Sequence, residues 1–228
     1  MPGRLLTLLR DRTRLIVSLP ANAPALAQAA AEAGADALKV HINVRHEASG
    51  TVFGSLAEEE EKLEGILALG LPTGIVPGVA ASLPSPDDMH QLEAMGVDFF
   101  DLYDHDMPLW LARWQGMTRG IAASHTTPAE SIAEFDGMGF ELLEAAIIPH
   151  DGYGQPLTAA DLAVYRRVRR ATKLPMIVPT QRAIQPEDVP MLAGLGVNAI
   201  MIGAIVTGRE PASVARATDR FAAALGRS

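Results

Sequence analysis

Cysteine is absent from the 228 residues of the chain. The sequence therefore excludes disulfides and metal centres with thiolate ligands. Positive charge is also scarce, since 19 Lys and Arg stand against 27 Asp and Glu for a net charge of −8. A protein that binds nucleic acids broadly needs a basic face, so we expect no nucleic-acid partner.

Long apolar runs are missing as well, so no segment reaches the ~20 apolar residues of a membrane span. The first segment, "MPGRLLTLLRDR", lacks the long apolar core and small-residue cleavage site of a signal peptide. It predicts instead a short capping helix at about residues 3–12. We therefore expect a cytoplasmic protein without a membrane partner.

Hydrophobic residues make up 48% of the chain, enough for a sizeable core. Eight short apolar runs are typical of buried strands, at residues 14–20, 35–43, 71–78, 97–106, 118–126, 140–150, 174–181 and 197–203. Helical patterns separate or follow them, at residues 23–34, 56–70, 85–96, 127–139, 158–173, 185–196 and 210–226. This alternation predicts a closed parallel (β/α)₈ barrel, the TIM barrel, as one domain over residues 1–228. A doubly wound open sheet is the alternative.

A weak repeat marks four of these strands: "GADALKV", "GVDFFDL", "GFELLEA" and "GVNAIMI". Interior side chains of such a barrel stack in layers of four, each drawn from alternate strands. The sixth position of the repeat predicts one such layer, made of Lys39, Asp101, Glu144 and Met201. Two residues further on, the repeat predicts a layer nearer the mouth, made of His41, Tyr103, Ala146 and Gly203.

Lys39 is the feature of this layer that indicates chemistry. A buried ammonium keeps its charge only beside carboxylates, here Asp101 and Glu144. Buried ion pairs stabilise poorly compared with apolar packing, and lysine suits proton transfer or Schiff-base chemistry. We predict a catalytic group of Lys39, His41, Asp101 and Glu144. A structural ion network that fills the barrel is the alternative.

The last third resembles the ribulose-phosphate-binding barrel superfamily, and within it the N-acetylmannosamine-6-phosphate 2-epimerase family. The similar motifs are "PED" at 186–188, "LG" at 195–196 and "MIGAIVTG" at 201–208. The resemblance implies a phosphate held after the last two strands, on Gly203 and Ala204. The catalytic lysine and glutamate of that family have no counterpart in "TGIVPG" and "VPTQR". After the seventh strand the chain has Gln181 and Arg182 instead, and we predict that their side chains also bind the phosphate.

Other polar residues follow the strands, where the active sites of this fold lie. Asn43 continues the inward face of the second strand, and Tyr103 belongs to the fourth. His125 and His150 end the fifth and sixth strands, and Tyr153 lies in a glycine-flanked loop typical of a lid. We predict that the substrate pocket contains Asn43, Tyr103, His125, His150 and Tyr153.

Together these residues predict an isomerase, epimerase or lyase that acts on a small phosphorylated metabolite, such as a sugar phosphate. Proton transfer next to a carbonyl needs a base, here Glu144 or Asp101, and an electrophile, here Lys39 or His41. A Schiff base on Lys39 is a variant. We expect no cofactor, no resident metal and a homodimer. Two alternatives stay open: a transferase with Mg²⁺ on Asp101 or Asp104, and a non-catalytic barrel that binds a phosphorylated ligand.

Overall fold

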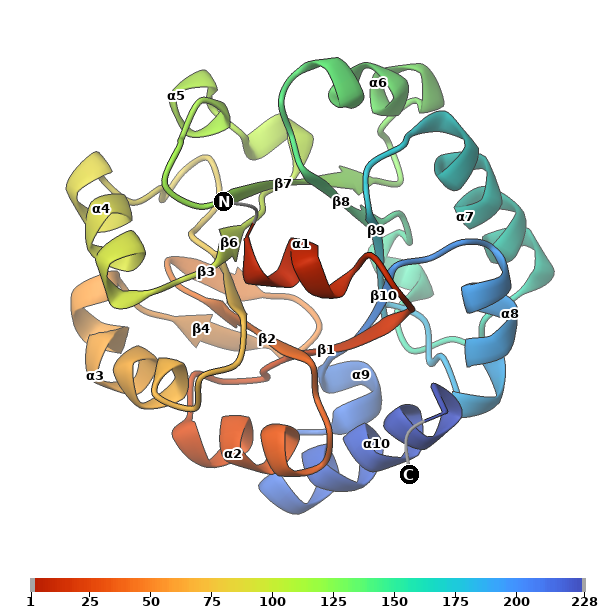
Figure 1. Cartoon of the computed structure of the whole chain (residues 1–228), viewed down its shortest axis with the longest axis horizontal. Coiled ribbons are helices and arrows are strands. Elements are labelled where there is room, and N and C mark those ends of the chain that lie inside the picture. The colour runs from red at the N-terminus through yellow and green to blue at the C-terminus, as the bar shows by residue number, and fades with distance from the viewer. Residues whose placement is uncertain (1–2, 227–228) are drawn as a thin grey trace.

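The computed structural model describes residues 3–226 and contains a closed barrel of eight parallel strands (Figure 1). Around the barrel the order is β1-β10-β9-β8-β7-β6-β5-β2. The strands are β1 (Arg14–Ser18), β2 (Ala37–His41), β5 (Thr73–Val76), β6 (Phe99–Phe100), β7 (Thr118–Ser124), β8 (Leu142–Ala146), β9 (Met176–Pro179) and β10 (Ala199–Ile202). The prediction of a single TIM barrel is confirmed.

Helices form the outer ring. They are α2 (Pro24–Glu32), α3 (Leu56–Leu67), α4 (Pro86–Met95), α5 (Leu109–Ala112), α6 (Ala129–Glu134), α7 (Ala159–Ala171), α8 (Val189–Gly194), α9 (Ala204–Thr207) and α10 (Pro211–Ala224). Short 3₁₀ turns add η1 (Asp104–Asp106), η2 (Phe135–Gly137), η3 (His150–Gly152) and η4 (Pro186–Asp188). Helix α4 shows how sequence sets the bounds: Ser85 caps the amide of Asp88, and Gly96 ends the helix with φ +96°.

Helix α1 (Arg4–Leu8) closes the amino-terminal end of the barrel and lies across its centre in Figure 1. The amides of Arg4 and Leu5 donate to the carboxylate of Asp98 at 2.7 and 2.8 Å. Leu5 and Leu9 pack on the lowest interior residues, among them Phe99. The predicted capping helix therefore exists, shorter than the predicted 3–12, and covers this end of the barrel.

Phe99 fills the barrel interior beside Gly74. A Cβ atom on Gly74 would lie 2.0 Å from the Phe99 ring, so only glycine admits the aromatic ring there. The strand β6 that carries Phe99 is two residues long, far shorter than the predicted 97–106. It continues as a single parallel bridge from Tyr103 to Ala122 and then enters η1.

A hairpin of β3 (Val44–His46) and β4 (Thr51–Phe53) follows β2. The sequence predicts only a long loop here. Asn43 starts the hairpin in the left-handed conformation, with φ +54°, and its amide donates to the carbonyl of Gly54 at 2.8 Å. Thr51 holds the other arm, since its hydroxyl donates to the carbonyl of Pro20 at 2.7 Å.

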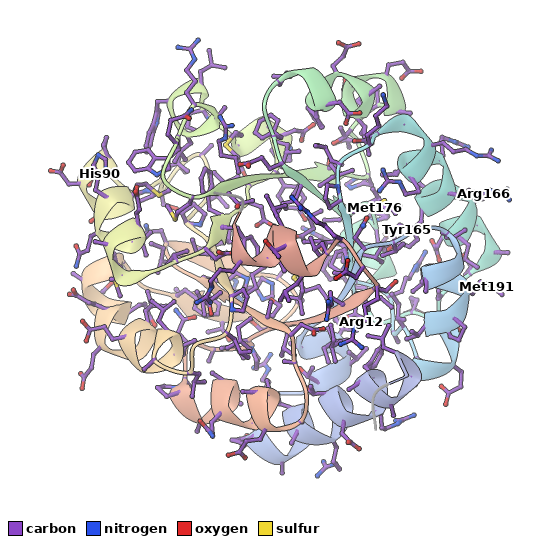
Figure 2. All side chains as sticks on the ribbon, viewed as in Figure 1. Arg12, His90, Tyr165, Arg166, Met176 and Met191 are labelled. Carbon is purple, nitrogen blue, oxygen red and sulfur yellow. The ribbon has the colours of Figure 1, made fainter. Side chains whose placement is uncertain are left out.

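The outer ring separates apolar and charged faces. On α7, Tyr165 turns toward the barrel and is fully buried, whereas Arg166 extends outward (Figure 2). Within residues 3–226, no helix is long and apolar enough to cross a membrane.

Candidate functional site

A cavity of about 540 Å³ opens at the carboxyl ends of the strands. Its lining includes both predicted interior layers: Lys39, Asp101, Glu144, Met201, His41, Tyr103, Ala146 and Gly203. The hairpin contributes a wall through Val44, Arg45 and His46. The volume falls within the range of small-molecule sites, and its position is where TIM-barrel enzymes hold their substrates.

Lys39 lies at the floor of this cavity, with 3% of its surface exposed. Its Nζ is 2.8 Å from Oδ1 of Asp101 and 3.0 Å from Oδ2, and it also donates to Oε2 of Glu144. All three residues point into the barrel, which confirms the predicted charged layer. The three side chains form a closed ion cluster that faces the ligand space.

Burial and the mutual attraction of the three charges shift the pKa values of Lys39 and Glu144. Burial opposes the charge on Lys39, but the attraction of Asp101 and then of Glu144 outweighs it and raises the pKa of the ammonium above its usual value. Burial raises the pKa of Glu144 to about 8, and the Asp101 carboxylate adds to this while Lys39 opposes it. Lys39 therefore stays charged at neutral pH, and Glu144 exchanges a proton near neutrality.

In the layer nearer the mouth, the His41 ring packs against the rings of His46 and Phe53 from the hairpin. The His41 ring centroid is 4.4 Å from that of His46 and 4.8 Å from that of Phe53. Burial, then the neighbouring His46 and Lys39, lower the pKa of His41 well below its usual value. Burial and then Lys39 lower the pKa of His46 to about 4. Both imidazoles are therefore neutral at pH 7.

Gln181 ties three segments together at the ends of β8 and β9. Its Oε1 accepts from the amide of Ile148 at 3.1 Å, and its Nε2 donates to the carbonyl of Ala146 at 3.3 Å and to the hydroxyl of Tyr153 at 2.7 Å. Both amide hydrogens are thus engaged. The Gln181 side chain thus lines the cavity and holds Tyr153 beside it, and its role in phosphate binding stays a prediction.

Arg182 and Asn43 form their hydrogen bonds with groups outside the cavity lining. Arg182 makes a bidentate pair with Asp161, at 3.0 Å for both Nε and Nη2, and its Nη1 donates to the carbonyl of Gly152 at 2.9 Å. Asn43 donates from Nδ2 to the carbonyl of Pro77 at 3.2 Å. Neither side chain lines the cavity. Both side chains fasten loops in this structure.

Gly203 and Ala204 lie where the resemblance expects a phosphate. Gly203 lines the cavity, and its amide donates to the hydroxyl of Thr180 at 3.0 Å. Ala204 begins α9, whose first backbone bonds run from Val206 and Thr207 to the carbonyl of Gly203. Gly203 thus stands immediately before the first turn of α9, and helix starts in general favour anions.

The remaining predicted pocket residues line the cavity together. Tyr103 and Tyr153 form its wall, and His125 and His150 lie at its exposed rim. Among the residues described, no group of three or more His, Cys, Asp or Glu is placed to hold a metal. Asp104, an expected Mg²⁺ ligand of the transferase alternative, accepts from Thr127 at 2.9 Å.

The lining also includes polar residues outside the predicted site, among them Ser18, His46 and Thr180. Ser18 and Thr180 are polar residues at the carboxyl ends of β1 and β9, a signal that was available because the sites of this fold lie there. His46 depends on the hairpin, and no pattern in the sequence places its ring against His41.

Neither a protein-family model nor a curated protein matches the chain. Solved structures do match. A tryptophan synthase of Mycobacterium tuberculosis has a TM-score of 0.75 at 16% identity, covering 99% of each chain. Thiamine phosphate pyrophosphorylase from Pyrococcus furiosus gives 0.67 at 17% identity, covering 96% of this chain and 98% of that one. The tryptophan synthase A-subunit from Pyrococcus furiosus gives 0.66 at 18%, covering 93% and 98%.

The likeness is one of fold. At such identities the match assigns this chain the TIM barrel and leaves its chemistry to its own residues.

Proposed function

We propose that this barrel is an isomerase or lyase that moves a proton next to the carbonyl of a small phosphorylated metabolite. The observation that carries the proposal is Glu144. It is a buried carboxyl at the cavity floor, its pKa is raised to about 8, and Lys39 holds a permanent positive charge beside it. Perturbed acids that face a cavity are typical of proton-transfer sites.

The upper layer indicates how a ligand reaches this acid. Ala146 stands above Glu144 on β8, and Gly203 directly follows β10 near the mouth, so both positions leave space. The opposite positions carry the large rings of His41 and Tyr103. A phosphate at Gly203 and Ala204 would therefore place the carbons of a short metabolite over Glu144.

Glu144 in its ionised form would take the proton from the carbon next to the carbonyl. The electrons of that C–H bond move to the carbonyl oxygen and create an enolate. The Lys39 ammonium offsets the negative charge of the ionised cluster. Return of the proton to the former carbonyl carbon, with transfer of the neighbouring hydroxyl proton to the enolate oxygen, gives an isomerase. Expulsion of a leaving group from the enolate gives a lyase.

A Schiff base on Lys39 is disfavoured, because its raised pKa keeps the amine protonated and without a nucleophilic lone pair. The transferase alternative draws support from the likeness to thiamine phosphate pyrophosphorylase. Against it, Asp101 is bound to Lys39. A requirement for Mg²⁺ in turnover would favour the transferase, and binding without turnover would favour the non-catalytic barrel.

Hydrogen exchange tests the proposal whatever the final product of the reaction is. The protein is incubated in D₂O with dihydroxyacetone phosphate and with ketose and aldose phosphates, and ¹H NMR follows loss of the proton next to each carbonyl. We expect exchange with at least one compound, with a kcat/KM that rises toward pH 8 as Glu144 ionises.

Glu144→Gln keeps the size of the side chain and removes the base, so it should lower the exchange rate by about 10²-fold or more. Glu141→Gln is the matched control. Glu141 directly precedes β8, the strand that carries Glu144, and its carboxylate accepts from the backbone amide of Arg119. This variant should exchange the substrate proton at the wild-type rate. Exchange that survives Glu144→Gln would refute Glu144 as the base. Absence of exchange across the panel would refute the proton-transfer function for these substrates.

A further inference from the structure

The ion cluster occupies the Lys39 ammonium and so leaves a gap in the proposed reaction. A new enolate oxygen needs a hydrogen-bond donor, and an ammonium has three N–H donors. Nζ of Lys39 already contacts both oxygens of Asp101, at 2.8 and 3.0 Å, and one oxygen of Glu144. Another group of the cavity must therefore meet the enolate oxygen.

His41 carries a nitrogen that is free to do so. Within residues 3–226, Nδ1 of His41 is buried and has no hydrogen-bond partner. Nε2 has no partner in this part of the chain either, but it is not closed off in the same way. Because His41 lines the cavity, Nε2 is the polar atom that its ring presents to a ligand.

The two nitrogens differ in which one carries the proton. Burial, then His46 and Lys39, lower the pKa of His41, so the neutral ring has one N–H and one lone pair. Buried N–H groups without an acceptor are rarer in proteins than buried acceptors without a donor. The lone pair therefore belongs at Nδ1 and the proton at Nε2. A neutral imidazole in this state can polarise a carbonyl group beside a glutamate base.

Backbone and ring contacts hold the His41 side chain in place. Nδ2 of Asn22 donates to the carbonyl of His41 at 2.6 Å, and Oδ1 of Asn22 accepts from its amide at 3.3 Å. The rings of His46 and Phe53 pack against the imidazole. Nδ1 of His46 is itself occupied by the hydroxyl of Ser49 at 2.9 Å. The position of the imidazole is thus fixed before a ligand enters.

A small residue lies across the barrel from His41. Three strands separate β2 from β8 in either direction around the barrel, so these two strands face each other. Lys39 on β2 and Glu144 on β8 meet across this diameter. Two residues further along each strand, His41 stands opposite Ala146. The methyl group of Ala146 leaves space for a ligand between the two strands, above Glu144.

We propose that His41 is a catalytic residue whose Nε2–H donates a hydrogen bond to the carbonyl oxygen of the substrate. The inference rests on the proposed proton transfer. While Glu144 takes the proton from carbon, the C–H electron pair forms the new C=C bond and the π pair of the carbonyl moves onto oxygen. His41 stabilises that charge and keeps its own proton. The site thus selects a short ligand whose carbonyl lies between Glu144 and His41, with its phosphate toward Gly203.

Two amide substitutions test which nitrogen acts. The amide nitrogen of glutamine reaches the place of Nε2, whereas that of the shorter asparagine lies near the place of Nδ1. Isothermal titration calorimetry measures the affinity of wild type, His41→Gln and His41→Asn for inorganic phosphate and for 2-phosphoglycolate, whose carboxylate imitates an enolate. His90→Asn is the control, because His90 lies on α4 outside the cavity lining with its side chain 70% exposed. Thermal unfolding confirms that each variant is folded.

Loss of a hydrogen bond to a charged group predicts that His41→Asn weakens phosphoglycolate binding about 10- to 100-fold. The phosphate affinity of this variant should stay at the wild-type value. His41→Gln should retain most of the phosphoglycolate affinity, because its amide restores a donor at the place of Nε2. The control should bind both compounds as wild type does.

NMR of ¹⁵N-labelled histidine side chains determines the tautomer in wild type. The chain has six histidines, and the signals that are missing in His41→Gln identify those of His41. In the free protein at pH 7 we expect a protonated Nε2 and an unprotonated Nδ1. Phosphoglycolate should shift the Nε2 proton signal, whereas inorganic phosphate should leave it in place.

Different failures have different meanings. If wild type binds neither compound, the phosphate site is wrong and the role of His41 falls with it. If both compounds bind but His41→Asn discriminates them as wild type does, the proposed function stands and His41 is not the donor. Equal losses from His41→Gln and His41→Asn would assign the effect to ring packing and overturn the assignment. A proton on Nδ1 in free wild type would also overturn it, even if neither variant folds.

Discussion

Removal of the Lys39 charge is the most direct test of the ion cluster. In Lys39→Met the side chain keeps most of its length, but Asp101 loses a partner at 2.8 Å and Glu144 loses the only cation that touches it among the described contacts. Burial raises the pKa of Glu144, so without Lys39 this carboxyl takes up a proton more readily than an exposed glutamate does. The loss therefore falls mainly on Asp101, which becomes an unpaired buried carboxylate.

Breaking a buried pair in this way costs roughly 3–5 kcal/mol in the free energy of unfolding. At lower pH more of the unpaired carboxylates are protonated. The loss in the free energy of unfolding should therefore be larger at pH 8 than at pH 5. Urea unfolding followed by circular dichroism at both pH values measures it. Lys62→Met is the matched control: this ammonium also contacts a glutamate, Glu59, at 3.1 Å, but its side chain is 49% exposed. The control should lose less than about 1 kcal/mol.

The triple variant Lys39→Met, Asp101→Val, Glu144→Leu should recover most of the loss, since packed apolar groups can replace a buried ion cluster. A Lys39→Met protein within about 0.5 kcal/mol of wild type at pH 8 would show that the cluster is not the close, dry group described above. Strong destabilisation combined with unchanged phosphoglycolate affinity would make Lys39 a structural residue only.

Two further predictions follow from the phosphate position and the histidine pair. Gly203→Asp should abolish binding of inorganic phosphate, because its carboxylate repels the anion, whereas the neutral isostere Gly203→Asn should retain more of that binding. The added Cβ is 3.6 Å from Ser18, an ordinary contact, so both variants should fold. Equal phosphate affinities of the two variants would show that charge is not the cause. The pKa of His46 falls from 6.5 to about 4 on folding, so its contribution of roughly 3 kcal/mol is complete above pH 6.5 and is lost as the pH falls toward 4. His46→Gln should flatten this acid limb in urea titrations, and an unchanged slope between pH 6.5 and 4.5 would contradict a buried neutral imidazole.

The barrel and its charged layer are readable from the sequence because one repeat fixes the phase of four strands. The structure supplies the physical reason for the polar third position of that repeat. Asp36 accepts the amide of Leu15 at 2.7 Å, Glu141 that of Arg119 at 3.1 Å, and Asn198 that of Met176 at 2.9 Å. Each polar side chain thus ties the start of its strand to the start of a neighbouring strand. Once the start is fixed, alternation decides which side chains point inward.

Beyond the strand ends the inward or outward direction of a side chain cannot be predicted from the sequence, because loops have no regular alternation. Gln181 and Arg182 are adjacent in the sequence, yet one orders Tyr153 at the cavity wall and the other pairs with Asp161 on α7. Their partners lie about 20 to 30 positions away and are chosen by loop geometry. Asn43 keeps the inward phase of Lys39 and His41, but its positive φ ends the strand and starts the hairpin. The hairpin then brings His46 against His41. The reactive floor of the site is therefore a property of the strand pattern, while the groups that hold and orient a ligand above it are properties of the loops.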